Sequence, residues 1–444
     1  MKRYETYKDS GIQWVGEIPS HWDVVKTSYL FDDIGSGTTP NTNDDSLYDT
    51  DNGINWLQTG DLNDGHITKT SKKISQKAIE GNGTLRLYPI NSLVIALYGA
   101  TIGKVGVLDI ESTTNQACCV LPPSDKISTD FAYYIFLASK EALLNLASGG
   151  GQPNISQAII KNHRIPYPSY AEQQSIVSFL EDKVGQIDAA IAEKEQMLED
   201  LKAYRSAIIS EAVTKGLDKN VEMKDSGVEW IGMIPKHWNI NKLKFFADIS
   251  TGTTPSTDNE EYWKEPTENW YTPSDFCEEN VHLETSSRKV STTAFQESAC
   301  RVFKKDVVLV VGIGATLGKI GISSVECSAN QQINAIEFYD NVYPLFGAYY
   351  LSSLKEVMKS LASAATLAIM NQSVTGSIPF VCPTLDEQKE IADYLEKKTK
   401  SIGSLLNQIE VQIDELKSYK SVLITEAVTG KNDLRDWNPK EENV

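Results

Sequence analysis

The chain repeats most of its sequence motifs about 215 residues later, and this duplication constrains the fold more than any other feature. Residues 8–22 (KDSGIQWVGEIPSHW) return as residues 224–238 (KDSGVEWIGMIPKHW). Shorter blocks return in the same order, namely GTTP at 37–40 and 252–255, GATxGKxG at 99–106 and 314–321, Glu-Gln at 172–173 and 387–388, and EAVT at 211–214 and 426–429. A duplication with so long a period indicates two similar units. Two such units suggest pseudo-twofold symmetry, and a target read by both would have two parts.

Length and cysteine content favour a cytoplasmic protein with several domains. The 444 residues are enough for two to four domains, each with its own core. The six cysteines contain no CxxC pair, which fits a reducing compartment better than secretion. Because no apolar run approaches the ~18 residues that a membrane span needs, we expect a soluble protein.

The net charge of −18 excludes the simplest kind of nucleic-acid binder. Acidic residues outnumber basic ones in every segment of the chain. A protein that grips a duplex alone normally presents a basic face, because neutralising phosphates supplies much of the affinity. The charge therefore indicates either no strong binding by the isolated chain or a partner that supplies phosphate contacts.

Each copy divides into a mixed part and a long helix. Runs such as 92–98 and 306–312 are rich in β-branched residues and lie between turn-forming clusters, whereas 130–146 and 345–361 have apolar residues at helical spacing. We expect an α+β protein with two tandem domains and two long helices. The predicted segments are domain 1 at 1–165, a central spacer helix at 166–220, domain 2 at 221–383, and a distal spacer helix with a tail at 384–444.

The two closing segments carry a heptad pattern in matching register. Apolar residues alternate at steps of four and three, which defines a coiled-coil seam. Lys194, Arg205 and Lys420 interrupt it, and snorkelling stems or the carboxylates of a partner can accommodate them. Helices over 171–214 and 386–429 would each run ~66 Å and must bury one apolar stripe, so we expect them to form an intramolecular coiled coil rather than a generic dimer. The predicted seam residues are Ile187, Ile191, Leu198, Leu201, Ile402, Leu406, Ile413 and Leu416.

Motifs that resemble catalytic or cofactor sites fail on spacing. Residues 312–319 resemble a phosphate loop, but five residues separate the first Gly from Gly-Lys and Ile320 replaces the magnesium-binding Ser or Thr. We interpret both glycine-rich blocks as turns where backbones pack closely, while leaving open that Lys104 and Lys319 contact phosphate. The five histidines match no metal or catalytic spacing, and His21 and His237 are expected in packed aromatic corners beside tryptophans. The sequence predicts no catalytic residue and no metal site.

Residues 41–98 and 256–313 differ between the copies and carry polar side chains on expected turns. Asn, Thr, Ser, Gln, Lys and Arg side chains are suited to base edges and phosphates. A shared scaffold with variable polar loops is what two recognition domains with different targets need, although any one of these loops can be an ordinary solvated loop. The candidate DNA-binding residues are Gln58, Thr59, Lys72, Lys73 and Lys104 in domain 1 and Thr272, Ser274, Arg288, Lys289 and Lys319 in domain 2.

The order of the repeated blocks resembles the specificity (S) subunit of type I restriction-modification systems. The resemblance covers essentially the whole chain and rests on DSGxxWxGxIPxHW, GATxGKxG, Glu-Gln at a helix start and EAVT. It implies two domains that each read half of a split site in double-stranded DNA, held apart by antiparallel helices. It also implies two modification (methyltransferase) subunits docked on the helices, and restriction (translocase and endonuclease) subunits.

The resemblance places the chemistry on these partners. S-adenosylmethionine and ATP with Mg²⁺ would bind the partner subunits, and the absence of an Asn/Asp-Pro-Pro-Phe/Tyr signature argues against a fused methyltransferase. Two other classes stay in view. A coiled-coil scaffold explains the helices but needs no divergent polar loops, and a nucleotide-dependent enzyme is disfavoured by the spacing of both glycine-rich turns.

Overall fold

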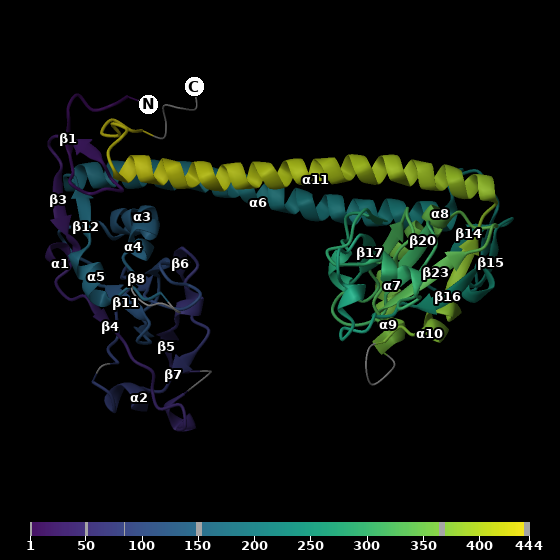
Figure 1. Ribbon diagram of the computed structural model, residues 1–444. Helices are drawn as coiled ribbons and strands as arrows, with labels where there is room; N and C mark the ends of the chain where they lie inside the picture. The colour runs from purple at the N-terminus through teal and green to yellow at the C-terminus, as the bar shows by residue number, and fades with distance from the viewer. Residues whose placement is uncertain (1, 49–51, 84, 148–152, 364–368, 439–444) are drawn as a thin grey trace. The chain divides into compact units, whose positions relative to one another are not determined.

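The protein was analysed as a computed structural model that describes residues 2–48, 52–83, 85–147, 153–363 and 369–438. The chain forms two compact units (Figure 1). Unit 1 comprises residues 1–193 and 412–444, and unit 2 comprises residues 194–411. Each unit therefore contains one α+β domain and half of each long helix, so the units are divided within the helices.

Unit 1 is built on a five-stranded and a three-stranded sheet. The five-stranded order is β4-β11-β8-β9-β6, and all neighbours are antiparallel except β6 with β9. These strands span Gly35–Ser36, Cys118–Leu121, Leu93–Ala96, Val105–Leu108 and Gly65–Ile67. The three-stranded order is β10-β5-β7, at Thr113–Thr114, Ile54–Leu57 and Lys73–Ile74.

Short strand pairs and helices complete unit 1. The pairs are β1 (Tyr7–Asp9) with β2 (Glu17–Pro19) and β3 (Asp23–Lys26) with β12 (Arg164–Tyr167). The helices are α1 (Thr27–Leu30), α2 (Gln76–Glu80), α3 (Thr129–Ala138), α4 (Lys140–Asn145) and α5 (Gln157–Asn162), with 3-10 turns η1 (Asp45–Leu47) and η2 (Thr59–Asp61). The single helical stretch expected at 130–146 is thus divided at Ser139, whose backbone leaves the α region.

Unit 2 repeats this topology strand for strand. Its five-stranded sheet has the order β16-β23-β20-β21-β18, at Ala247–Thr251, Ile333–Phe338, Val307–Val311, Ile320–Ser323 and His282–Leu283. Its three-stranded sheet has the order β19-β17-β22, at Lys289–Val290, Glu268–Tyr271 and Ser328–Ala329. The expected two-domain α+β architecture is confirmed.

The remaining elements of unit 2 also match those of unit 1. The strand pairs are β13 (Met223–Asp225) with β14 (Met233–Pro235) and β15 (Asn239–Lys242) with β24 (Pro379–Cys382). The helices are α7 (Thr292–Gln296), α8 (Pro344–Ser352), α9 (Lys355–Ser363) and α10 (Gln372–Ser377), with η3 (Leu243–Phe245), η4 (Glu260–Tyr262) and η5 (Pro273–Asp275).

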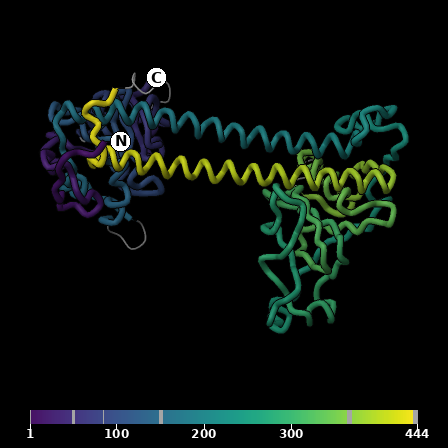
Figure 2. The backbone as a smooth tube through the Cα atoms, turned by 90° about the horizontal axis from the view of Figure 1, so that it is seen from above, coloured from purple at the N-terminus to yellow at the C-terminus, as the bar shows by residue number. Residues whose placement is uncertain are grey.

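Two long helices, α6 (Tyr170–Lys215) and α11 (Leu385–Val428), run side by side in both views (Figures 1 and 2). Their bounds lie within one residue of the predicted 171–214 and 386–429. Most predicted seam residues are at most 9% exposed; these are Ile187, Ile191, Leu198, Ile402, Leu406 and Ile413. Leu201 and Leu416 are instead half-buried, so they contribute less apolar burial than the prediction assumed.

Candidate nucleic-acid interface

The divergent residues lie on a small module with its own core. We define the recognition module as the three-stranded sheet with its short helix: β5, β7, β10 and α2 in unit 1, and β17, β19, β22 and α7 in unit 2. Trp56 packs with Ile74, Ala78 and Leu85 in module 1, and Trp270 packs with the matching apolar residues in module 2. In Figure 1, β5, β7 and α2 lie at the end of unit 1 farthest from the long helices.

The repeated GTTP motif anchors each module to the larger sheet. A Cβ atom on Gly37 would lie 1.7 Å from the carbonyl oxygen of Thr114, and one on Gly252 would lie 2.3 Å from that of Ala329. Only glycine permits so close a backbone approach. The carbonyl of the next residue, Thr38, accepts a 3.2 Å hydrogen bond from Trp56 Nε1, and Thr253 does the same for Trp270 at 3.0 Å.

A carboxylate organises the turn that follows the central strand of each module. Asp275 Oδ2 accepts from the Thr272 N–H at 2.7 Å, and its Oδ1 accepts from the Ser287 N–H at 2.7 Å. Asp61 makes the equivalent bonds to the N–H groups of Gln58 at 2.9 Å and Ser71 at 3.0 Å. Each carboxylate therefore ties the turn after β5 or β17 to the segment before β7 or β19.

Four of the five DNA-binding residues predicted for each domain lie at this turn and the adjoining strand of their own module. Gln58 and Thr59 begin the turn in module 1, and Thr272 and Ser274 do so in module 2, where their hydroxyl oxygens lie 2.8 Å apart. The other four flank the start of β7 or β19; Lys72 and Arg288 are exposed, and Lys73 and Lys289 are half-buried.

Arg288 is held by aromatic rings rather than by a carboxylate. Its guanidinium carbon lies 5.2 Å from the Trp263 ring centroid and 5.0 Å from that of Trp270. The two indole rings meet edge to face at 5.5 Å. A guanidinium over aromatic faces keeps its charge and its planar donors while losing side-chain freedom. Module 1 has Tyr48 beside Trp56 in the matching place, with centroids 5.9 Å apart.

Lys104 and Lys319 lie elsewhere. Lys104 lies on the turn between β8 and β9, and Lys319 lies on the matching turn between β20 and β21. Both side chains are half-buried, and the preceding residues, Gly103 and Gly318, adopt positive φ of 75° and 84°. Lys319 Nζ donates to the carbonyl of Phe276 at 3.0 Å. Phe276 directly follows the turn that carries Thr272 and Ser274, so the Lys319 side chain ends beside that turn. The contact of Lys104 and Lys319 with phosphate stays a prediction.

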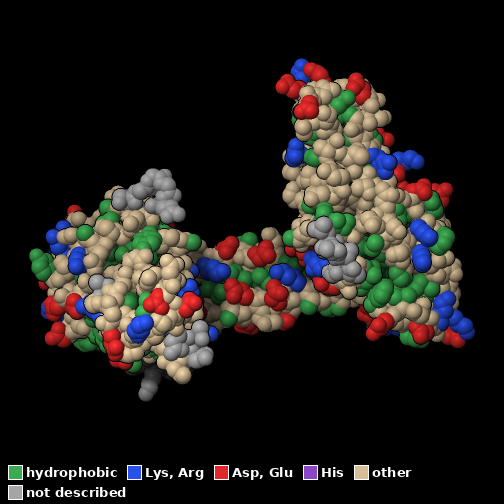
Figure 3. All heavy atoms as spheres, turned by 90° about the horizontal axis from the view of Figure 1, so that it is seen from below, with side chains coloured by type: hydrophobic (Ala, Val, Ile, Leu, Met, Phe, Trp, Pro, Cys, Tyr) green, Lys and Arg blue, Asp and Glu red, His purple; other side chains and the backbone are tan. Residues whose placement is uncertain are grey.

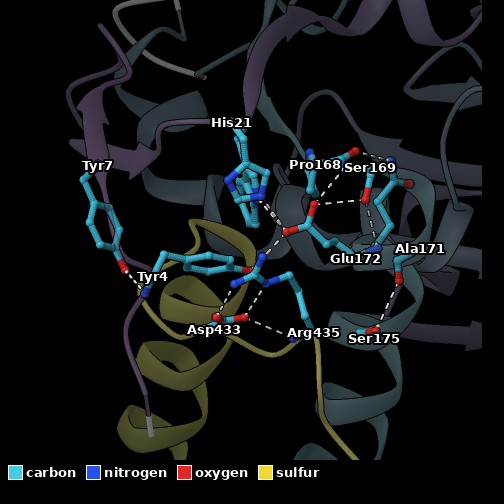
Figure 4. Close-up of polar contacts among 12 residues, drawn as sticks. Tyr4, Tyr7, His21, Pro168, Ser169, Ala171, Glu172, Ser175, Asp433 and Arg435 are labelled. Atoms are coloured by element: carbon cyan, nitrogen blue, oxygen red, sulfur yellow. Dashed lines mark hydrogen bonds and ion pairs between the residues drawn. The ribbon is translucent and has the colours of Figure 1, made fainter.

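The remaining repeated motifs join each domain to the start of a long helix (Figure 4). Glu172 Oε1 on α6 accepts from Trp22 Nε1 at 3.2 Å and lies 2.8 Å from His21 Nε2. Glu387 on α11 makes the same contacts with Trp238 and His237, at 3.2 and 2.8 Å. The expected aromatic corners are therefore centred on a carboxylate that the sequence reasoning missed. The matched Glu-Gln block was the available signal.

These carboxylates are kept ionised by their donors. Burial alone would raise the pKa of Glu387, but hydrogen bonds from Thr384, His237 and Trp238 lower that pKa to about 2. The pKa of Glu172 is lowered in the same way by His21, Trp22 and Ser169 against the effect of burial. An ionised carboxylate that accepts several bonds fixes the angle at which a helix leaves its domain.

Charge on the surface is mixed. On the face drawn in Figure 3, basic side chains are scattered among acidic ones and form no continuous patch on the residues shown in colour. Among the residues that the structure describes, no group of His, Cys, Asp or Glu is arranged to hold a metal ion. Within the same ranges, no helix is both long and apolar enough to cross a membrane.

Two recognition modules on one repeated scaffold match a known family. The family model described as type I restriction modification DNA specificity domain matches residues 19–200 and again 235–415. The chain belongs to this family. The two matches coincide with the two copies of the repeat, so each copy is one specificity domain.

Similar proteins carry the same description. The MjaVIII specificity subunit of Methanocaldococcus jannaschii is 24% identical, and the match covers 95% of each chain. The MjaIX specificity subunit of the same organism is 28% identical over 258 residues, and that match spans only 57% of the relative.

Solved structures share the fold. A chain from a structure of complex assembly and conformational transition in a type I R-M system has a TM-score of 0.72 at 15% identity, covering 94% of this chain and 99% of that one. The HsdS subunit from Thermoanaerobacter tengcongensis has a TM-score of 0.50 at 16% identity, covering 94% and 98%.

Proposed function

We propose that this chain is the DNA sequence-specificity subunit of a type I restriction-modification complex, in which each recognition module reads one half of a split site. The proposal rests on one observation, which is a difference between the two copies of the recognition module. The two modules share strands, anchoring tryptophan and turn carboxylate, yet they present different side chains at the same place. Gln58 begins the turn of module 1 and Lys72 precedes β7, whereas Thr272 and Ser274 lie on the turn of module 2 and Arg288 precedes β19.

The exposed side chains suit direct readout. Arginine and lysine donate to guanine edges or to phosphates, and glutamine can form two bonds to adenine. Arg288 is already oriented by two indole rings, so it loses little further entropy when it binds a base. A coiled-coil scaffold without DNA recognition would not need such different polar turns on matched modules, and we do not favour it.

The long helices would dock two modification subunits. Tyr204 on α6 and Tyr419 on α11 occupy the same repeat position and are 56% and 54% exposed. Large aromatic side chains left exposed at matched positions suit a partner that binds each copy in the same way. We propose that these partners bind S-adenosylmethionine and supply phosphate contacts, and that the restriction subunits use ATP and Mg²⁺. This chain itself would be non-catalytic.

Methylation-aware sequencing of host DNA tests the proposal. We compare the wild-type strain, a deletion of this gene, and the deletion complemented with the gene. The expected result is a split motif with modified adenines on both strands that vanishes in the deletion and returns on complementation. An unchanged methylome in all three strains, in cells that express the chain together with its methyltransferase partner, would contradict the proposal.

A further inference from the structure

The repeat leaves one aromatic site filled in unit 1 and its counterpart open in unit 2. In unit 1 the tail that follows α11 returns along the start of α6. Trp437 meets Phe179 edge to face with centroids 5.0 Å apart, and Lys183 Nζ lies 5.1 Å from the indole centroid. Leu434, in the same tail, is buried. The tail therefore covers the apolar corner between the two helices of unit 1.

Further contacts tie this tail to unit 1. Lys431 Nζ donates to the carbonyl oxygens of Val15 and Glu17 at 3.0 and 2.6 Å, and the Asp433 N–H donates to the carbonyl of Lys2 at 2.8 Å. Arg435 pairs with Asp433. Figure 4 shows Arg435 and Asp433 beside Tyr4 and close to Glu172. The tail is thus a specific element of unit 1, because directional bonds hold it on both sides.

In the described part of unit 2, no segment equivalent to the tail covers the same corner. Tyr394 stands at the repeat position of Phe179, with Lys398 Nζ 5.8 Å from its ring centroid. Phe179 is fully buried, whereas Tyr394 is half-buried. After α6 the chain turns directly into β13 and supplies no tryptophan. A cavity of about 400 Å³ opens here, lined by Ile208, Glu211, Ala212, Lys215, Gly216, Leu217, Asp218, Lys219, Met223 and Tyr394.

The cavity has the character of a peptide anchor site. Its lining is mixed: apolar side chains alternate with charged ones, which come both from the last turns of α6 and from the segment after it. Leu217 is 41% exposed. A pocket of this size, in which apolar and charged side chains are mixed, suits an aromatic anchor with a polar edge. Trp437 shows which kind of side chain this corner of the fold accepts.

We propose that the cavity between the end of α6 and the start of α11 in unit 2 binds an aromatic side chain presented by a modification subunit. The occupant is a partner segment that bears a tryptophan or phenylalanine and so does in unit 2 what Trp437 does in unit 1. The proposal rests on the proposed function, because it takes the partner to be the subunit that docks on these helices. Among the described residues, the corner is open in unit 2, whereas the tail occupies it in unit 1.

Photo-cross-linking within the complex tests the proposal. A benzoylphenylalanine residue replaces Leu217 in the full chain, which is expressed with the modification subunit and irradiated after purification. We expect a covalent adduct with the modification subunit that maps to a segment with an aromatic residue. The same substitution at Val325, which is 48% exposed on a different turn of unit 2, is the matched control and should give no such adduct.

Competition identifies the anchor. A synthetic peptide of residues 430–438 (GKNDLRDWN) should lower the adduct about tenfold when its concentration is about ten times its dissociation constant. The same peptide with Trp437→Ala should not compete. A complex that forms and methylates DNA but gives no adduct from position 217, or an adduct with a second copy of this chain, would overturn the inference while leaving the proposed function intact. Failure to form any complex would overturn both.

Discussion

Lys420 on α11 donates from Nζ to both carboxylate oxygens of Asp188 on α6, each at 2.7 Å. The pair resolves one interruption of the heptad pattern within unit 1. In unit 2 the repeat places Arg205 at the position of Lys420 and Gly403 at that of Asp188. Arg205 is only 8% exposed, its guanidinium donates to the carbonyl of Glu279, and its Nε has no hydrogen-bond partner. Burial lowers the pKa of Arg205. One copy therefore lacks a carboxylate that the other has.

Restoring that carboxylate should stabilise unit 2. A Cβ atom on Gly403 would meet no atom within 4 Å, so Gly403→Asp fits without rearrangement. Gly403→Ala, the matched control, should raise the free energy of unfolding by about 0.5–1 kcal/mol through helix propensity alone. Asp is a poorer helix former than Ala, so a greater gain from Gly403→Asp in denaturant unfolding would show pairing with Arg205. An equal or smaller gain would show that Arg205 does not reach the new carboxylate.

Acid should destabilise unit 1 through His163. The side chain is 7% exposed and stacks on Trp14, with ring centroids 6.2 Å apart and planes 8° from parallel. Burial lowers the pKa of His163 to about 4. Since the unfolded residue titrates near 6.5, the unfolded chain binds more protons between these values, and stability is lost as the pH falls from 6.5 towards 4.

The second copy supplies the variant for this test, because Ile378 stands where unit 1 has His163. His163→Ile should remove about 2 kcal/mol of the stability that unit 1 loses between pH 7.5 and pH 5. Hydrogen exchange of unit 1 peptides at the two pH values measures the difference. The same acid sensitivity in wild type and variant would mean that His163 is solvated and protonates freely in the folded chain.

The turn carboxylates should matter for recognition more than for folding. Asp275→Ala removes the acceptor for the Thr272 N–H of the turn and for the Ser287 N–H of the segment before β19, so the turn loses its tie to that segment. We expect affinity of the assembled complex for its site to fall about 10- to 100-fold, as for the loss of one or two good base contacts. Only the half-site read by unit 2 should lose discrimination, as measured by competition with mutated half-sites. Loss of discrimination at both half-sites would contradict the assignment.

Lys72 and Lys104 can be separated by salt. Lys72 is exposed on the recognition module, whereas Lys104 is half-buried on the turn between β8 and β9 of the larger sheet. If Lys72 contacts phosphate, Lys72→Ala should weaken binding to all sequences and reduce the slope of log affinity against log salt by about one. Titration of the complex at several salt concentrations gives the slope. An unchanged slope for Lys72→Ala, or a reduced slope for Lys104→Ala, would reassign the phosphate contact.

Replacing Leu198 or Leu201, the two leucines of the α6 seam, with alanine should lower the free energy of unfolding by different amounts. Leu198 is 9% exposed and Leu201 is half-buried. Leu198→Ala should lower the free energy of unfolding by about 2–5 kcal/mol, and Leu201→Ala by less, because less apolar surface is lost and no enclosed cavity forms. Denaturant unfolding of both variants measures the order. The reverse order would place the seam one position away from the heptad assignment.

The architecture could be predicted from the sequence because its signals are periodic and repeated. The heptads located both helices within one residue at each end, and the matched blocks identified two similar domains. The burial of individual side chains was harder to predict from the sequence, since Leu201 follows the heptad pattern but is only half-buried. Heptad position specifies the direction of a side chain, whereas burial depends on what the neighbouring helix places opposite it.

The sequence predicted where the candidate interface lies, but not the hydrogen bonds that organise its turns. Residue type and placement identified the polar turns, and four of the five residues predicted for each domain lie at or beside the turn of its module. The role of Asp61 and Asp275 was not predicted, although both follow a repeated tryptophan by five residues. Each carboxylate accepts one bond from an N–H three residues earlier, as in a capping box, and a second from an N–H ten or twelve residues later, and no local side-chain pattern records that second partner. Lys104 and Lys319 belong to the GATxGKxG motif, which forms a tight turn of the larger sheet and is not part of a recognition module.

The central claim is that each module independently reads one half-site, and an exchange of the divergent segment that carries most of each module tests it most directly. Residues 256–313 are replaced by the equally long segment 41–98 of the same chain, and host DNA is sequenced for adenine methylation. The account predicts that the split motif becomes an inverted repeat of the half-site read by unit 1, with the spacing unchanged because α6 and α11 are untouched. Methylation of the original asymmetric motif by the exchanged chain would contradict it.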